Sequence, residues 1–161
     1  MSTSTRDIGL HESGSGGEFT ILNDDLLLSE TLFNTIYIAL FGGNVEADTL
    51  GNEIVGEERF DYWGNSLVFA DLPDKQFNSQ TERTLRNTTV NTEGRLIIQK
   101  AVENDLSFLS KIVNFTVSII LLDTNKIKIE IRLESISNTA SKEIQFIWDN
   151  ARNEVIINKT I

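Results

Sequence analysis

The stretch that decides the fold runs from residue 115 to residue 133 and reads FTVSIILLDTNKIKIEIRL. Its second half, Lys126 to Leu133, alternates a charged residue with isoleucine or leucine at every position. A period of two places successive side chains on opposite faces of a β-strand. Because Asp123-Thr-Asn125 supplies a turn between the halves, the sequence predicts an antiparallel hairpin with one buried and one wet face.

Two more strands are expected after this hairpin. Ile144, Phe146 and Trp148 are spaced for one strand face, and Val155 to Ile157 follows across the turn Asp149 to Asn153. If the last strand lies at the edge of the sheet, its free backbone groups can pair with a neighbouring chain. The alternative is an edge that polar side chains such as Lys159 simply blunt.

Two helices are expected before the hairpin. The first begins near Ser29-Glu30, keeps apolar residues on one face up to Phe41, and stops at Gly42-Gly43. The second runs from Thr92 to Ile112 with a wide apolar stripe of period near 3.6. Between them, Ser79-Gln-Thr-Glu82 has the form of a capping box and predicts a short helical turn.

The N-terminal residues predict a loose hairpin between Asp7 to Leu10 and Glu18 to Leu22, across a Gly/Ser loop, followed by a turn at Asn23-Asp24-Asp25. Strands that are segregated from helices favour an α+β fold over an alternating parallel one. We therefore expect one small α+β domain over residues 1–161, with two main helices packed on a mostly antiparallel sheet and hairpins at the C-terminus.

Composition excludes several classes of function. The chain of 161 residues has no cysteine, which excludes disulfides, cysteine-ligated zinc and a thiol nucleophile. Its net charge of -10 disfavours direct contact with nucleic acid and anionic lipid. The first residues lead into no apolar segment typical of a secretory signal, and no run is suited to insertion into a membrane, so we expect synthesis in the cytoplasm.

No grouping of residues predicts catalysis. His11 is the only histidine and stands beside a glycine-rich loop without obvious partners. Asp24-Asp25 has the residues of a turn, and the acidic stretch Glu57 to Asp61 raises a glycosidase-like carboxylate pair only as an alternative to a solvated loop. Templates for a nucleophile elbow, a phosphate loop or a dinucleotide fingerprint are missing from the sequence. The prediction is therefore a protein that is not an enzyme, with no catalytic, cofactor-binding or metal-binding residues.

Aromatic residues in the irregular middle of the chain are the main candidates for contact with other proteins, because aromatics are enriched at the centres of interfaces. The same side chains can instead fill the core of their own domain, and both interpretations stay open. The interface candidates, with two residues of the last strand, are Tyr62, Trp63, Phe69, Phe77, Val155 and Ile157.

Several ordered segments resemble one known family. They are Asp7-Ile-Gly-Leu10, Asp24-Asp-Leu26, the helix Thr31 to Phe41 ending in Gly42-Gly43, the element Tyr62-Trp-Gly-Asn-Ser-Leu67, and the long helix from Thr92 that leads into strands up to Glu134. In this order they resemble the Mu-like phage baseplate proteins, which are related to the small wedge component of the T-even baseplate. Asn65 stands where the family more commonly has aspartate, and residues 139–161 look like an appended hairpin.

The resemblance implies a virion protein of a contractile tail that is made and assembled in the bacterial cytoplasm. It implies multiple copies in a sixfold ring, packed on the large wedge protein near the tube and the first sheath ring. The implied partners are the large wedge protein and a second small wedge protein, with the sheath and tube proteins as further candidates. Two alternatives stay open: a tail-associated hydrolase of the cell wall, and a baseplate part of a related contractile injection or secretion system.

Overall fold

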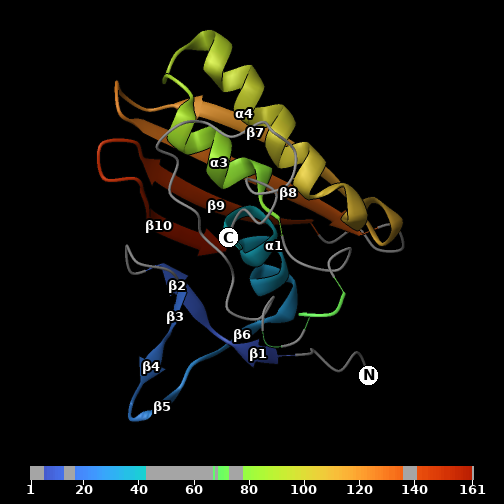
Figure 1. Cartoon of the computed structure of the whole chain (residues 1–161). Coiled ribbons are helices and arrows are strands. Elements are labelled where there is room, and N and C mark those ends of the chain that lie inside the picture. The colour runs from blue at the N-terminus through green and yellow to red at the C-terminus, as the bar shows by residue number, and fades with distance from the viewer. Residues whose placement is uncertain are drawn as a thin grey trace.

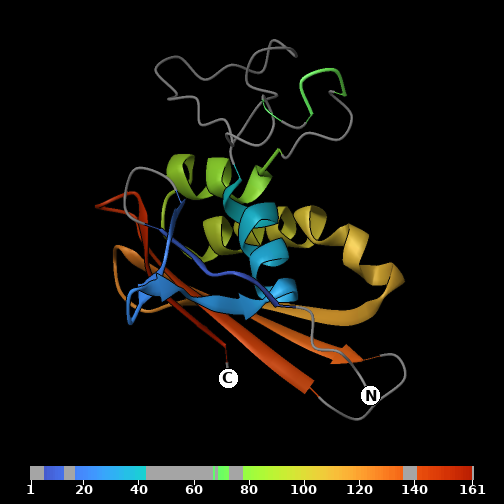
Figure 2. The ribbon, with the colours of Figure 1, turned by 90° about the horizontal axis from the view of Figure 1, so that it is seen from below.

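The computed structural model describes residues 6–12, 17–42, 67, 69–72, 78–135 and 141–160. In these ranges the chain forms an α+β domain, as the sequence predicts (Figures 1 and 2). Helices α1 (Thr31–Phe41), α3 (Gln80–Asn87) and α4 (Thr92–Asp105) lie over one face of a four-stranded antiparallel sheet. The core lies between this helical layer and the sheet.

The sheet has the strand order β10-β9-β8-β7. Its strands are β7 (Val113–Leu121), β8 (Lys126–Ser135), β9 (Ser141–Asp149) and β10 (Glu154–Thr160). The predicted alternation is confirmed, because the four apolar residues at positions 127, 129, 131 and 133 of β8 are all buried. On the opposite face charges pair across the sheet, as between Arg132 of β8 and Glu143 of β9 at 3.5 Å. That face therefore carries both acidic and basic side chains, which pair with one another.

The C-terminal hairpin is built into the core. Its strand β9 is an inner strand between β8 and β10, and its residues Phe146 and Trp148 are buried. The Phe146 ring centroid lies 5.4 Å from that of Phe41 on α1. The sequence predicts an appended hairpin over residues 139–161, but the described part of this hairpin supplies buried side chains to the core.

The second long helix is shorter than the sequence predicts. Helix α4 ends at Asp105, and a 3-10 helix η3 (Ser107–Lys111) follows after Leu106, whose φ of -90° and ψ of 0° leave the α-helical path. The tighter turn keeps Leu106 and Leu109 buried and reverses the chain into β7, while Ile112 is left 66% exposed. Periodicity alone did not reveal this break, since the buried residues continue at helical spacing across it.

Helix α3 confirms the capping box and extends it to eight residues. The Ser79 hydroxyl accepts a hydrogen bond from the backbone N–H of Glu82 at 3.1 Å, which satisfies one of the free amides at the helix start. The same hydroxyl donates to the carbonyl oxygen of Leu40 near the end of α1. One buried serine thereby joins the ends of two helices.

A β-ribbon precedes the helical layer. It consists of β1 (Arg6–Ile8), β2 (Leu10–Glu12), β3 (Gly17–Phe19), β4 (Ile21–Leu22), β5 (Asp25–Leu26) and β6 (Leu28–Glu30). The expected hairpin is only partly correct. Strands β2 and β3 do pair, but β1 pairs with β6, and β4 pairs with β5 around the predicted turn. Helix α1 begins one residue after β6 and ends at Phe41, close to the predicted limits.

A ring of backbone hydrogen bonds explains this change of partner. The N–H of Gly9 donates to the carbonyl of Leu27 at 2.6 Å, that of Leu27 donates to Thr20 at 2.8 Å, and that of Thr20 donates back to Gly9 at 3.0 Å. The three segments therefore meet at Gly9, Thr20 and Leu27. Beyond these residues, each strand pairs with a different partner strand. A Cβ atom on Gly9 would lie 3.1 Å from the Leu27 carbonyl oxygen, so glycine fits this junction best. Within the described ranges no helix has the length and apolar character needed to cross a bilayer.

Candidate interaction surfaces

The sequence-predicted interface residues fall into two groups. Tyr62, Trp63 and Phe77 lie outside the described residues, as does the acidic stretch Glu57 to Asp61. Phe69 is described and partly buried, and its carbonyl accepts a hydrogen bond from the N–H of Leu72 at 2.9 Å. Phe69 is thus neither fully buried in the core nor fully exposed to solvent.

One of the two candidates in the last strand has a buried side chain. Val155 is only 7% exposed and stands opposite Trp148, so its side chain belongs to the core of its own domain. The Val155 side chain is therefore turned inward, and a contact with a partner through the backbone of this strand stays a prediction. Ile157 pairs in register with Ile147 after an irregularity in the ladder. Its contact with a partner stays a prediction.

Strand β10 lies at one end of the strand order, an edge position that the sequence had left open. The ladder with β9 shifts register between Val155 and Ile157, and β2 contacts β10. Bulges and covering segments are two common ways in which proteins blunt an edge strand. Both interpretations of this edge therefore keep support, and the pairing of β10 with a neighbouring chain stays a prediction.

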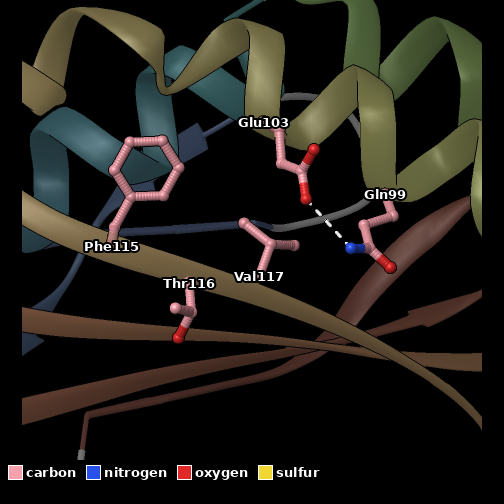
Figure 3. Close-up of a pocket in the computed structure, with 5 residues that line it drawn as sticks. All are labelled: Gln99, Glu103, Phe115, Thr116 and Val117. Carbon is pink, nitrogen blue, oxygen red and sulfur yellow. Dashed lines mark hydrogen bonds between the residues drawn. The ribbon is translucent and has the colours of Figure 1, made fainter.

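The opposite edge, β7, borders a groove that the sequence did not reveal. An open groove of about 470 Å³ lies between α4 and β7 and is lined by Gln99, Glu103, Phe115, Thr116 and Val117 (Figure 3). Phe115 and Val117 point toward α4, while Thr116 points to the other face of the sheet. On α4, the side-chain amide of Gln99 donates to the carboxylate of Glu103 at 2.9 Å.

This groove has the chemistry of a binding surface for an extended chain. Among the described residues β7 pairs only with β8, so the backbone groups along its outer edge have no strand partner there. An added strand would place alternate side chains against Phe115 and Val117, which are partly buried. Glu103 supplies one carboxylate at the wall and Gln99 one amide. A single carboxylate with an amide does not form a general acid and base pair.

Asp105 connects the helices above this groove to one another. Its carboxylate accepts hydrogen bonds from the backbone N–H of Gln80 at 3.1 Å and of Thr81 at 2.8 Å, at the start of α3. Burial raises the pKa of Asp105 above its ordinary 3.8, although the hydrogen bonds from α3 oppose the shift. The carboxylate therefore works as a structural link that is partly withdrawn from water.

This link predicts a pH dependence of stability. Because the pKa of Asp105 is raised in the folded state, the folded protein holds this proton more tightly than the unfolded chain. The contribution of this proton to the free energy of unfolding is complete at pH values below the pKa of Asp105 in the unfolded chain. It is lost as the pH rises through the pKa of Asp105 in the folded protein. Relative to the non-titrating variant Asp105→Asn, the free energy of unfolding of the native protein should decrease as pH rises from about 4 to about 7. Urea denaturation at several pH values measures this, and a constant difference would contradict it.

A group of six exposed apolar residues lies on the β-ribbon. Its members are Phe19, Ile21, Leu22, Leu26, Leu27 and Leu28, which are between 37% and 70% exposed. The sequence carries a signal for this surface that the period-two pattern of strands does not capture. The apolar residues are consecutive on both sides of Asn23-Asp24 instead of alternating with polar ones. Strands with apolar residues on both faces cannot bury all of them against a single surface.

The described residues contain no group of three or more histidine or acidic side chains placed to hold a metal ion. His11 stands in β2 in register with Glu18 of β3, and Asp24 and Asp25 lie at the tip of the ribbon. Comparisons with protein-family models, with curated protein sequences and with solved structures gave no match for this chain.

Proposed function

We propose that this chain is a structural subunit of a contractile phage tail baseplate, a wedge component that packs on the large wedge protein near the tube and the first sheath ring. The order of elements supports this proposal: α1 ends at Phe41, just before Gly42, and α4 leads through η3 into the hairpin of β7 and β8. These are among the segments on which the resemblance to the Mu-like baseplate family rests.

The observation that carries the proposal is the unpaired edge of β7 beside the groove under α4. A strand edge recognises an extended segment of a neighbour through main-chain hydrogen bonds, and the adjacent apolar side chains select what lies beside it. Such contacts are individually modest. In a closed sixfold ring each of them is repeated, so that the assembly is held by multivalency. During contraction the subunit would move with its wedge while it holds the first layer of the sheath.

The decisive test is the location of the protein in particles. Deleting its gene from the tail gene cluster should leave tails without a complete baseplate, and restoring it should return the protein to purified baseplates in a multiple of about six copies per particle. Cryo-electron microscopy of the tail measures both. If the purified protein instead clears bacterial cell wall in a zymogram, the alternative of a tail hydrolase replaces this proposal.

A bulky side chain in the groove should weaken assembly. Replacing the partly buried Gln99 by tryptophan would fill the space between α4 and β7, and co-assembly with the neighbouring protein should fall on the order of tenfold. Lys100→Trp is the matched control, because Lys100 is the next residue on α4, is exposed and does not line the groove. Equal yields of complex from both folded variants would exclude this groove from the assembly.

A further inference from the structure

Exposed apolar side chains lie on both faces of the tip of the β-ribbon. Neighbouring residues of a strand point to opposite faces, yet Ile21 is 70% exposed and Leu22 is 56% exposed. Leu26 stands opposite Ile21 and is 42% exposed, whereas Asp25 stands opposite Leu22. Leu27, the residue after β5, is 37% exposed. A hairpin that lies flat on a core needs only one apolar face. This ribbon instead has the surface of a strand pair that is covered from two sides.

The described residues do not provide this cover. Figure 1 shows β4 and β5 extending away from the helices and the sheet. An isolated two-stranded hairpin is at best marginally stable in water. Exposed apolar side chains that cluster on a protein surface are a mark of an interaction site.

The ribbon forms an arm, with a tight turn at its tip and a base that is hydrogen-bonded to the core. Asn23 and Asp24 have positive φ angles of 54° and 62°, which form the tight two-residue turn that suits the twist of a hairpin. At its root, the side-chain amide of Asn34 on α1 donates to the carbonyl of Ile8 at 2.6 Å. Asn34 is 2% exposed, so the base of the arm is tied to the core. This hydrogen bond therefore connects the base of the arm to α1.

The charge at the tip selects the kind of partner. Asp24 and Asp25 form no ion pair with any described cation, and Asp25 accepts only the N–H of Leu26, at 2.8 Å. Two grooves on the described surface contain acidic residues of their own, Glu103 in one and Glu93 in the other. With a net charge of -10, a second copy of this chain is a poor receptor for an acidic tip.

We propose that the ribbon inserts into an apolar cleft with two walls on a different protein, whose floor carries lysine or arginine side chains that receive Asp24 and Asp25. Only the identity of that protein, a neighbour in the tail baseplate, rests on the proposed function. The contact itself follows from the exposed apolar side chains on both faces, the anchored root and the acidic tip.

Photo-crosslinking tests the two walls directly. The photoreactive residue p-benzoylphenylalanine is placed at Ile21 in one full-length variant and at Leu22 in another, in cells that express the complete tail gene cluster. Both positions should cross-link to the same foreign protein, at two separate segments that mass spectrometry identifies. Cross-links to a second copy of this chain only, or from one position only, would overturn the proposal.

Surface substitutions supply the matched controls. The double variant Ile21→Ser with Leu26→Ser should recover the cross-linked partner on the order of tenfold less well, because both residues are exposed and lie outside the core. Asp24→Lys with Asp25→Lys should also weaken recovery. Leu96→Ser with Ile97→Ser removes apolar surface of similar exposure from α4 and should leave recovery unchanged.

The inference about the ribbon and the proposed function can be contradicted independently of each other. If this chain is absent from tails but both ribbon positions cross-link to one protein, the ribbon inference stands and the baseplate function falls. If this chain is present in tails and the serine variant assembles at the native yield, the ribbon inference falls while the function stands. Circular dichroism of each purified variant establishes that the fold is intact.

Discussion

Replacing Phe146 with alanine is expected to lower the free energy of unfolding by about 3–5 kcal/mol. Phe146 is 0% exposed and stands on the inner strand β9, with its ring centroid 5.4 Å from Phe41 and 5.9 Å from Phe33. Removing it would leave a cavity where α1 meets the sheet, and stiff packed neighbours collapse only partly into such a space. Since small domains have a total stability of about 5–15 kcal/mol, most of the margin would be lost.

The neighbouring residue provides the control for this prediction. Ile147 follows Phe146 on β9 but points to the opposite, partly exposed face of the sheet. Its replacement by alanine removes apolar atoms from a side chain that is only partly buried, so we expect a loss of about 1 kcal/mol. Urea denaturation followed by tryptophan fluorescence measures both. Similar losses for the two variants would contradict the assignment of β9 as a strand with one buried face.

Replacing Gly94 with alanine is expected to destabilise the protein by about 2–3 kcal/mol, although alanine is the better helix former by about 1 kcal/mol. Gly94 is buried in the first turn of α4, and its N–H donates to the side-chain oxygen of Asn91 at 2.8 Å. A Cβ at this position would collide with the carbonyl oxygen of Thr89 and lie 2.8 Å from the Thr88 methyl group. The backbone before the helix would have to move.

Arg95→Ala is the control for Gly94, because Arg95 is the next residue of the helix and is exposed. This variant gains helix propensity without a steric contact and should stay within about 0.5 kcal/mol of the native protein. Thermal unfolding followed by circular dichroism compares the two. A Gly94→Ala variant as stable as Arg95→Ala would show that the chain before α4 accommodates a side chain.

The strands and helices with strong periodicity could be predicted from the sequence. The alternation from Lys126 to Leu133 became β8, and the capping pattern at Ser79 became the start of α3. Both signals are local, since they depend on residues within a few positions of one another. The end of α4 at Asp105 escaped the prediction because the apolar spacing continues through the break. That break also depends on α3, whose first amides bind the Asp105 carboxylate.

The candidate surfaces were harder to predict than the fold. The sequence left open whether the last strand lies at an edge of the sheet, and the strand order places it there. The sequence also named Val155 as an interface candidate, and the structure buries this side chain. The groove beside β7 was missed, because it is made of residues from α4 and β7 that come together only when the helix packs on the sheet. The exposed ribbon was missed because consecutive apolar residues usually indicate a buried strand.

By itself the amino-acid sequence determined the α+β class, the hairpin of β7 and β8, and the strands that supply Phe146 and Trp148 to the core. Hydrophobic periodicity and turn residues act over short distances, so their effect does not depend on which distant segments pack against them. Only the tertiary structure decided which strand edge is unpaired, which apolar side chains stay in water and how the ribbon exchanges partners at Gly9. Those features depend on contacts between distant segments, and a residue type does not specify which distant surface will cover it.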